Sequence, residues 1–500
     1  MAADAGARAL MFQGTGSDVG KTVLVAGLCR AARQRGIRVL PFKPQNMSNN
    51  AAVADAGPDG HGGGEMGRAQ WLQALACGVA PSTDMNPVLL KPQSENGSQV
   101  IVQGRVAGTA RAREYFTMKP TLLDAVMESY NRLSSQADLI LVEGAGSPAE
   151  INLRRGDIAN MGFAERANVP VVLIGDIDRG GVIASIVGTH TILPEEDRSR
   201  ICGYIINKFR GDVSLFDDGL EAIRNFTDWP SFGVLPWVDA VRSLPAEDSV
   251  QLERLIGSGA GGVKIVVPVL GKIANFDDLD PLRLEPGVDL VFLRKGERIP
   301  DDAAMIILPG SKSTIADLSE LRANGWAEQI TAHARRGGQV VGICGGYQML
   351  GRRVLDPDGI EGDVREMDGL GLLDIETRMD RQKIVRNSKP VSVEFDLPLD
   401  GYEIHMGKTS GPDCARPMIG TINGSDGATS ADGNVRGCYL HGLFNSDAYR
   451  ARMLERLGVE VTARNHLGEV ERALDELAAA IEKHLDVEAL LARATPSAWR

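Results

Sequence analysis

The amino-acid sequence predicts an α/β protein with two domains, each built around a mostly parallel sheet, followed by a helical C-terminal tail. Three observations lead to this prediction. Short apolar runs alternate with helical stretches, a Gly- and Ser-rich stretch interrupts the alternation near residue 257, and helical periodicity takes over after residue 450. The 500 residues are enough for two to four domains, since a domain commonly takes about 100 to 200 residues.

The first half of the chain contains one series of expected strands. They are residues 8–12, 38–42, 138–142, 170–174 and 201–206. Each run is short, apolar and bounded by turn residues, and helical stretches separate the runs, which is typical of a parallel sheet covered on both faces. We therefore expect a first domain over residues 1–250.

The second half repeats this pattern after a predicted linker at residues 251–262, most of whose last six residues are Gly or Ser. Its expected strands are residues 263–269, 290–293, 304–308 and 339–343. A second α/β domain is thus expected over 263–450. Residues 451–500 form the predicted helical tail, because Leu474, Leu477 and Ile481 recur on one helical face that can pack on the core.

Composition excludes several classes of protein. Lys and Arg number 54 against 66 Asp and Glu, a net charge of −12, so nonspecific binding to nucleic acid or to anionic membranes is disfavoured. Six cysteines form no CxxC pair, which argues against structural zinc and a disulfide framework and favours a reducing cytoplasm. No apolar run approaches the roughly 18 residues of a membrane span, and the first one is too short for a signal peptide.

A phosphate loop is predicted at residues 14–22, GTGSDVGKT, between an expected strand and an apolar helical stretch. Glycines let backbone N–H groups face an anion, the helix N-terminus favours negative charge, the lysine neutralises phosphate and the threonine can hold Mg²⁺. The spacing departs from the usual motif, because Thr15 stands where the first Gly is expected. The predicted ATP-binding residues here are Gly14, Thr15, Gly16, Gly20, Lys21 and Thr22.

Acidic residues at strand ends are candidates for the remaining Mg²⁺ ligands. Glu143 ends the run 139–142 and is the best candidate, and Asp55, in the stretch after the second strand, is a weaker one. Asp176 and Asp178 follow a third strand. Each taken alone is more often a turn or helix-capping residue, but three strands that end in acids at one edge of the sheet favour a metal site. Asn207, which follows the strand at 201–206, could bind an adenine edge or simply begin a polar loop.

A nucleophilic cysteine is predicted where the strand at 339–343 runs into CGGYQMLG. Cys344 on a sharp strand-to-helix turn projects its sulfur from the sheet, where the helix N-terminus favours the thiolate. His441, at the end of a later apolar run, is the expected base. Gly310 and Gly345 could supply backbone N–H groups to an oxyanion hole, where one donor is typically worth about 10²- to 10³-fold in rate.

Together these stretches resemble the cobyric acid synthase family, glutamine-dependent amidoligases of cobalamin biosynthesis. The resemblance rests on stretches spread over roughly residues 10–445: FQGTGSDVGKT, PFKPQNMSNN, GRAQ, DMNPVLLKP, VEGAGSPAEINL, GDIDRGG, INKFRGD, LPGSK, GICGGYQMLG, GYEIHMG and YLHGLF. It implies a dethiobiotin-synthetase-like P-loop ATPase domain, followed by a glutamine amidotransferase domain of the flavodoxin-like class I type.

The resemblance also implies roles. Cys344 would be the glutaminase nucleophile and His441 its base, with ATP, Mg²⁺ and glutamine as cofactor and co-substrates. The acceptor would be adenosylcobyrinic acid a,c-diamide, amidated at its b, d, e and g carboxylates. Class I triads carry Glu two residues after the His, where Leu443 stands here. The group that orients His441 is therefore unidentified, and Glu403 and His405 are candidates.

An acidic protein that binds a polyacid needs a local cationic patch, for which six arginines are hypothetical contributors: Arg105, Arg111, Arg113, Arg154, Arg155 and Arg179. Alternatives to this function are cobyrinic acid a,c-diamide synthase, more distantly CTP synthase, and a partitioning-type P-loop ATPase with an inactive second domain. Leu443 disfavours CTP synthase, and an intact Cys344 and His441 disfavour the last alternative. The sequence leaves oligomerisation open.

Overall fold

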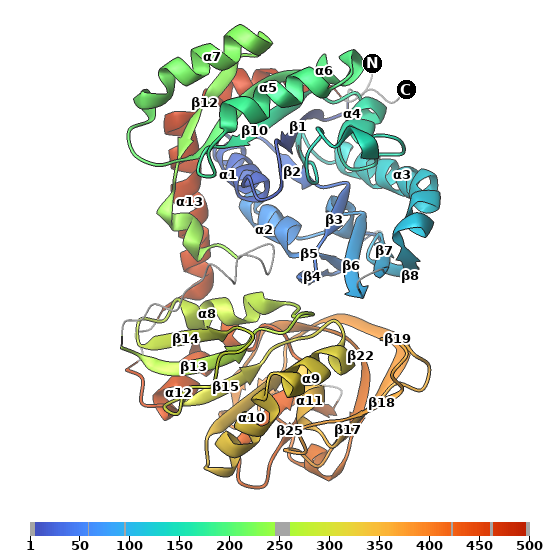
Figure 1. Cartoon of the computed structure of the whole chain (residues 1–500), viewed down its shortest axis with the longest axis vertical. Coiled ribbons are helices and arrows are strands. Elements are labelled where there is room, and N and C mark those ends of the chain that lie inside the picture. Colours follow the sequence, from blue (N-terminus) through green and yellow to red (C-terminus); the bar gives the residue numbers. More distant parts are fainter. Residues whose placement is uncertain are drawn as a thin grey trace.

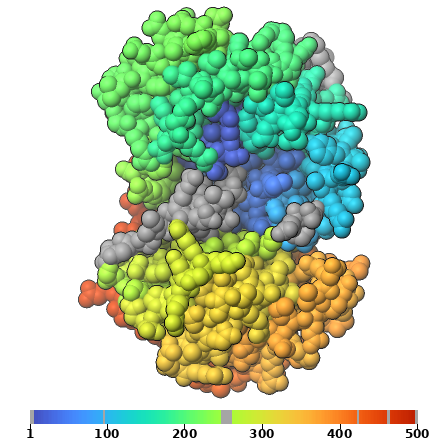
Figure 2. Space-filling view, in the orientation of Figure 1, coloured from blue at the N-terminus to red at the C-terminus, as the bar shows by residue number. Residues whose placement is uncertain are grey.

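The structure is a computed structural model that describes residues 6–58, 60–94, 97–245, 261–421, 424–460 and 464–496. The chain forms two lobes, one from its first half and one from its second, with a helix of the C-terminal tail running along the first lobe (Figure 1). Figure 2 shows the same two lobes in space-filling form. Residues 246–260, which include most of the predicted linker, lie outside the described residues.

The first domain is built on a sheet with the strand order β12-β11-β10-β1-β9-β2. In chain order these strands are β1 (Arg8–Gly14), β2 (Val39–Phe42), β9 (Leu139–Glu143), β10 (Val171–Asp176), β11 (Ile201–Phe209) and β12 (Ser231–Pro236). All of these neighbours pair in parallel. Their side chains are almost continuously buried, as expected of a parallel sheet covered on both faces. The carboxyl ends of β1, β9, β10 and β11 therefore meet along one edge of the sheet.

Helices cover both faces of this sheet (Figure 1). One face packs against α1 (Lys21–Gln34) and part of α2 (Arg68–Cys77). The other face packs against α3, α4 and α5, while α6 and α7 follow on the chain. Their bounds are α3 (Ala112–Ser134), α4 (Met161–Ala167), α5 (Val182–Ile192), α6 (Glu195–Arg198) and α7 (Asp217–Thr227).

Between β2 and α3 the chain forms two small sheets that the apolar pattern of the sequence did not predict. One contains β3 (Gln45–Met47), β6 (Val88–Ser94), β7 (Gly97–Val102) and β8 (Arg105–Arg111), and the other pairs β4 (Ala51–Ala54) with β5 (Gly64–Gly67). These sheets lie toward the second domain (Figure 1). Ala51, Val53 and Leu89 pack there against Tyr402 and Ile404 of that domain.

The second domain has a six-stranded sheet with the order β14-β13-β15-β16-β26-β25. Its strands are β13 (Val263–Pro268), β14 (Val288–Leu293), β15 (Met305–Leu308), β16 (Gln339–Ile343), β25 (Ala428–Thr429) and β26 (Val435–Cys438). The four pairs from β14 to β26 are parallel and only β25 is antiparallel. The helices of this domain are α8 (Asp280–Arg283), α9 (Thr314–Ala323), α10 (Trp326–Arg335), α11 (Gly345–Leu350) and α12 (Asp447–Arg456).

Two four-stranded sheets extend this domain between β16 and β26. The first has the order β18-β17-β19-β22, from β17 (Arg353–Leu355), β18 (Glu366–Asp368), β19 (Glu376–Ser388) and β22 (Gly401–Ser410). The second has the order β21-β20-β23-β24, from β20 (Val391–Ser392), β21 (Leu397–Pro398), β23 (Ile419–Thr421) and β24 (Gly424–Asp426). Parallel sheets, helices on their faces and a helical C-terminal end confirm the predicted fold class.

The C-terminal tail returns to the first domain. The helix α13 (His466–His484) packs its apolar face on α1, and α14 (Val487–Ala492) and β27 (Thr495–Pro496) follow it. Gly27 of α1 allows this close approach, because a Cβ there would lie 2.4 Å from Ile481 Cδ1 and 2.7 Å from Leu477 Cγ. β27 pairs antiparallel with β1. No helix in the described part of the chain is long and apolar enough to cross a membrane.

Candidate active sites

The phosphate loop lies between the end of β1 and the start of α1. Gly20 has a φ of 90°, which an L side chain rarely adopts, and a Cβ on Gly14 would lie 2.6 Å from Val19 Cγ2, so both positions require glycine. Lys21 Nζ donates to the carbonyl oxygens of Gly16 at 3.1 Å and Gly146 at 3.2 Å. The lysine therefore folds back over the loop, next to the N-terminus of a 14-residue helix that favours an anion.

Glu143 lies beside this loop, fully buried at the end of β9. Thr22 Oγ1 donates to Glu143 Oε1 at 2.6 Å, and Lys43 Nζ lies 2.8 Å from the same oxygen. Gln73 Nε2 of α2 donates to Glu143 Oε2 at 2.6 Å. A hydroxyl and a carboxylate side by side at a phosphate loop are the oxygen ligands that Mg²⁺ takes together with nucleotide phosphates, so these residues fit that ion.

Asp55, the weaker metal candidate, lies elsewhere. It is exposed after β4 and lines a cleft between the domains, whereas Thr22 and Glu143 are in direct contact at the loop. Sequence order alone could not show this separation, because the two small sheets carry the chain away from the main sheet directly after β2. Of the two candidates, the structure brings only Glu143 to Thr22.

Asn207, near the end of β11, contacts the phosphate loop. Its Nδ2 donates to the carbonyl oxygen of Val19 at 2.8 Å, and a Cβ on Gly20 would lie 2.5 Å from that nitrogen. Next to it, Lys208 Nζ pairs with Asp176 at 2.8 Å. Asn207 thus supports the loop directly, and its predicted contact with adenine stays a prediction.

The acids and arginines proposed near this edge are largely paired with one another. Asp178 pairs with Arg210 at 2.6 Å. Arg154 pairs with Asp197 and Glu165, both at 2.7 Å, and Arg179 pairs with Asp18 at 3.0 Å. Two of the six arginines of the hypothetical cationic patch therefore already have carboxylate partners.

Cys344 lies on the sharp turn between β16 and α11. Its φ of 52° and ψ of −107° are a strained backbone conformation for a residue with a side chain. Three glycines around it allow the turn to pack: a Cβ on Gly346 would lie 2.0 Å from the carbonyl oxygen of Leu308, and one on Gly345 2.8 Å from Ser311 N. Gly342 is equally confined, with Gly346 2.7 Å from its Cβ position. The sulfur is 3.5 Å from the carbonyl oxygen of Ile404.

His441, fully buried beside this turn, is oriented by a residue that sequence reasoning missed. Asp278 Oδ2 lies 2.7 Å from His441 Nδ1, and Gly442 N donates to Asp278 Oδ1 at 2.6 Å. Burial alone would lower the pKa of His441, but the charges of Asp278 and Cys344 outweigh it and raise the pKa to about 10. The remaining ring nitrogen, Nε2, is then the one available to exchange a proton with the thiol.

The near-motif candidates for the orienting group have other partners. Glu403 pairs with Arg386 at 2.8 Å, and His405 Nδ1 contacts the carbonyl oxygen of Gly407 at 2.9 Å. Leu443, at the position where class I triads carry Glu, is fully buried in the core. The one sequence signal for Asp278 is its place in the acid-rich run FDDLD of an otherwise apolar stretch.

The predicted oxyanion residues lie at the same site. A Cβ on Gly310 would be 3.0 Å from His441 Cε1 and 2.8 Å from the carbonyl oxygen of Ala274, so only glycine fits there. Gly345 N belongs to the first turn of α11, directly after Cys344. A Cβ on Gly345 would lie 2.8 Å from Ser311 N, so the turn that carries Gly310 lies directly beside the turn that carries Cys344. The role of the two glycines in an oxyanion hole stays a prediction.

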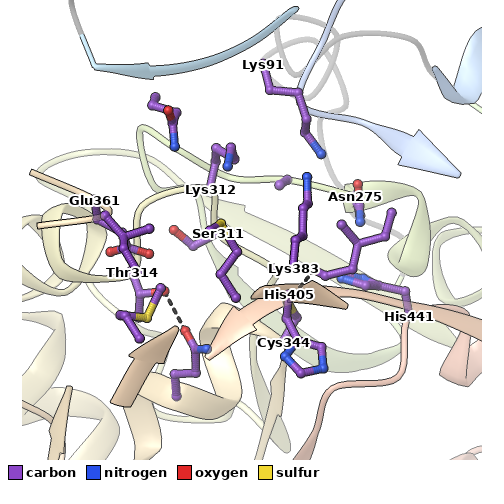
Figure 3. Close-up of a pocket in the computed structure, with 18 residues that line it drawn as sticks. Lys91, Asn275, Ser311, Lys312, Thr314, Cys344, Glu361, Lys383, His405 and His441 are labelled. Carbon is purple, nitrogen blue, oxygen red and sulfur yellow. Dashed lines mark hydrogen bonds between the residues drawn. The ribbon is translucent and has the colours of Figure 1, made fainter. Parts of the chain in front are cut away.

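A pocket opens from Cys344 toward the first domain (Figure 3). Lys91 reaches into it from β6, above Lys312 and Lys383 of the second domain. Glu65 of β5 binds two of these lysines: it pairs with Lys91 at 2.7 Å and with Lys383. Burial raises the pKa of Glu65, but the two lysines outweigh it and lower the pKa to about 2. The pocket at Cys344 thus has a wall supplied by the other domain.

The chain matches the models of two known domain families, one over each half. Residues 10–252 match the family model of a CobQ/CobB/MinD/ParA nucleotide binding domain, and residues 264–449 match that of a CobB/CobQ-like glutamine amidotransferase domain.

The chain is also similar over nearly its whole length to curated proteins called cobyric acid synthase. The identity is 66% with that of Mesorhizobium japonicum, over 97% of this chain and 99% of that protein. It is 66% with that of Rhizobium johnstonii, over 96% and 97%, and 63% with that of Brucella suis, over 98% and 100%.

Proposed function

This chain belongs to the cobyric acid synthase family, and we propose that it amidates the b, d, e and g carboxylates of adenosylcobyrinic acid a,c-diamide, with ammonia from glutamine and energy from ATP. It is a glutamine-dependent carbon–nitrogen ligase that acts on small molecules. The observation that carries the detailed proposal is the presence, in one chain, of the Thr22–Glu143 phosphate loop and the Cys344–His441–Asp278 constellation.

Ammonia is released at the second site. His441 takes the proton of Cys344, and the raised pKa of His441 favours the resulting thiolate–imidazolium pair. The thiolate attacks the side-chain carboxamide of glutamine, and the backbone N–H groups near Gly310 and Gly345 stabilise the oxyanion. His441 protonates the leaving ammonia, and water then hydrolyses the glutamyl thioester.

The acceptor is activated at the first site. A carboxylate resists attack by ammonia because it is anionic and would have to expel an oxide. Lys21 and the loop N–H groups bind the phosphates of ATP, whose γ-phosphoryl group passes to the carboxylate, and ammonia displaces phosphate from the acyl phosphate. Thr22 and Glu143 would hold Mg²⁺, which when bound neutralises charge on the phosphates.

Two further details belong to the proposal. Asn207 would lie near the adenine, since it holds the rear of the loop. We place the reaction in the cytoplasm, because all six cysteines are free, including the buried Cys344 whose reactivity needs a reducing compartment.

Mass spectrometry of the corrinoid product tests the proposal. Each amidation exchanges a hydroxyl for an amino group, so the number of small mass decrements counts the amides formed from the purified protein, ATP, Mg²⁺, glutamine and the a,c-diamide. Four decrements are expected. The same assay is run with cobyrinic acid, which lacks the a and c amides. No decrement on the a,c-diamide and two decrements on cobyrinic acid would identify cobyrinic acid a,c-diamide synthase instead.

A further inference from the structure

One short segment of the second domain, residues 274–278, supports both parts of the glutaminase site. Asp278 binds His441 Nδ1 and Gly442 N, as described above. Ala274 N donates to the carbonyl oxygen of Gly310 at 2.9 Å, which fixes the turn carrying the proposed oxyanion donor. A displacement of this segment would therefore move the base and the turn together.

Within the described residues, this segment contacts the first domain at three of its positions. Ala51 N donates to Asn275 Oδ1 at 3.0 Å, and Phe276 N donates to Asn50 Oδ1 at 3.3 Å. Arg68 Nε lies 3.0 Å from Asp277 Oδ2, with both side chains at least nine-tenths buried. Contacts with the other domain therefore help to fix the segment that carries Asp278.

Helix α2 joins these contacts to the phosphate loop. Arg68 is its first residue, and Gln73, in the middle of the same helix, donates to Glu143 Oε2 at 2.6 Å and to the carbonyl oxygen of Thr22 at 3.3 Å. The guanidinium of Arg68 also lies over the ring of Trp71, 4.1 Å from its centroid. One rigid helix therefore contacts the proposed nucleotide site and the segment that orients the base.

The charge of Arg68 is needed where it lies. Asp277 and Asp278 are adjacent buried acids, and burial and Asp278 raise the pKa of Asp277 while Arg68 opposes this rise. A buried carboxylate that loses its partner cation is strongly unfavourable. Without Arg68, Asp277 is expected to move toward water or to take up a proton, and either change disturbs the neighbouring Asp278.

We propose that α2, through Arg68 and Asp277, holds the glutaminase base in its active position and transmits to it the state of the phosphate loop. Mg²⁺ bound with a nucleotide at Thr22 and Glu143 would compete for Glu143 Oε2, the carboxylate oxygen to which Gln73 Nε2 donates. When Gln73 gives up this hydrogen bond, α2 moves. Arg68, the first residue of α2, then displaces its partner Asp277. Arg68 is in this view a positioning residue, and the inference rests on the proposed glutaminase activity of Cys344.

The test measures glutamine hydrolysis and the alkylation of Cys344 by iodoacetamide, each with and without ATP and Mg²⁺, in the full-length protein and in Arg68→Met. In the wild-type protein both rates are expected to respond to nucleotide. In Arg68→Met we expect kcat for glutamine to fall by about 10²-fold, as small misplacements of catalytic groups do, with KM unchanged and both rates insensitive to nucleotide. Arg68→Lys, which keeps the charge, should restore part of kcat.

Arg132→Met is the matched control, because Arg132, which is partly buried, pairs with the buried Asp84 at 2.6 Å within the first domain, away from residues 274–278. It should behave as the wild-type protein. Amidation supported by added ammonium shows that Arg68→Met is folded. A wild-type protein without nucleotide response, or an Arg68→Met protein with wild-type kcat and response, would overturn the inference. A wild-type protein without any glutaminase activity would instead overturn the proposed function.

Discussion

Replacing Asp278 with Asn tests the orientation of His441 most directly. Asp278 accepts from two donors, His441 Nδ1–H and Gly442 N–H. The Asn amide has only one oxygen, so it can serve one of these donors, and its NH₂ group faces the other position. If the NH₂ faces Nδ1, that nitrogen becomes the acceptor and the proton moves to Nε2. The imidazole can then no longer take the proton of Cys344.

The size of the effect follows from the pKa of His441. Its rise from 6.5 to about 10 corresponds to about 5 kcal/mol in favour of the imidazolium, at about 1.4 kcal/mol per unit. Because Cys344 contributes part of this rise, the share of Asp278 is smaller than this total. We expect a loss of about 10³-fold in kcat for glutamine hydrolysis, within the roughly 10⁴-fold that a wrong tautomer of the catalytic His can cost.

The assay is steady-state glutaminase kinetics as a function of pH. In the wild-type protein the thiolate–imidazolium pair persists until His441 deprotonates near pH 10, so the alkaline limb lies there. In Asp278→Asn the alkaline limb of the residual activity should move to lower pH, because the pKa of His441 falls back toward 6.5.

The matched control for this variant is Asp280→Asn. Asp280 is a buried acid on the same stretch, but it pairs with Arg283 at 3.1 Å. Asp280→Asn should keep the wild-type alkaline limb of the pH profile and most of the kcat for glutamine hydrolysis. Ammonium-dependent amidation should survive in both variants. If Asp278→Asn hydrolyses glutamine at the wild-type rate, Asp278 does not orient the base and the reasoning fails.

Three further predictions concern other parts of the molecule. Cys344→Ala should lose glutamine-dependent amidation and retain ammonium-dependent amidation, as product mass spectrometry can show; loss of both would mean that the two sites are not separate. Glu65→Gln should destabilise the protein by about 3 to 5 kcal/mol in urea titrations at pH 7, since Lys91 and Lys383 lose their buried partner. Because the pKa of Glu65 is lowered to about 2, its contribution is present above about pH 4.5 and is lost as the pH falls toward 2; a difference between the two proteins that does not shrink on acidification would contradict this. Gly27→Val should lower stability by about 1 to 3 kcal/mol in thermal melts, because its side chain would overlap Ile481 and Leu477, and an unchanged melting temperature would show that α13 can shift.

Much of the main architecture could be predicted from the sequence, because buried parallel strands are short apolar runs. The runs at 138–142 and 170–174 lie at β9 and β10 for this reason. The small sheets before α3 escaped prediction because strands such as β5, with sequence GEMG, show neither an apolar run nor alternation. The return of α13 to α1 is a long-range contact, which helical periodicity cannot specify.

The candidate sites divide in the same way. The phosphate loop and the Cys344 turn are local motifs, in which the chemistry and the backbone conformation are encoded within a few adjacent residues. Asp278 and Arg68 act across 163 and 209 positions of the chain, on His441 and Asp277 respectively, and no local motif links either residue to its partner. Asp55 shows the converse, since its place after a strand suggested a ligand although the chain had already left the sheet edge.

The source of the orienting carboxylate has a consequence for control. In a triad whose Glu follows the His by two residues, base and carboxylate share one short segment and need no other domain to bring them together. Here Leu443 fills that position in the core, and the carboxylate comes from residues 274–278, which Asn50, Ala51 and Arg68 of the first domain hold in place. Under the coupling proposed for Arg68, such a glutaminase reaches full activity only when the ATPase domain is docked. Ammonia is then released chiefly where an acceptor can use it.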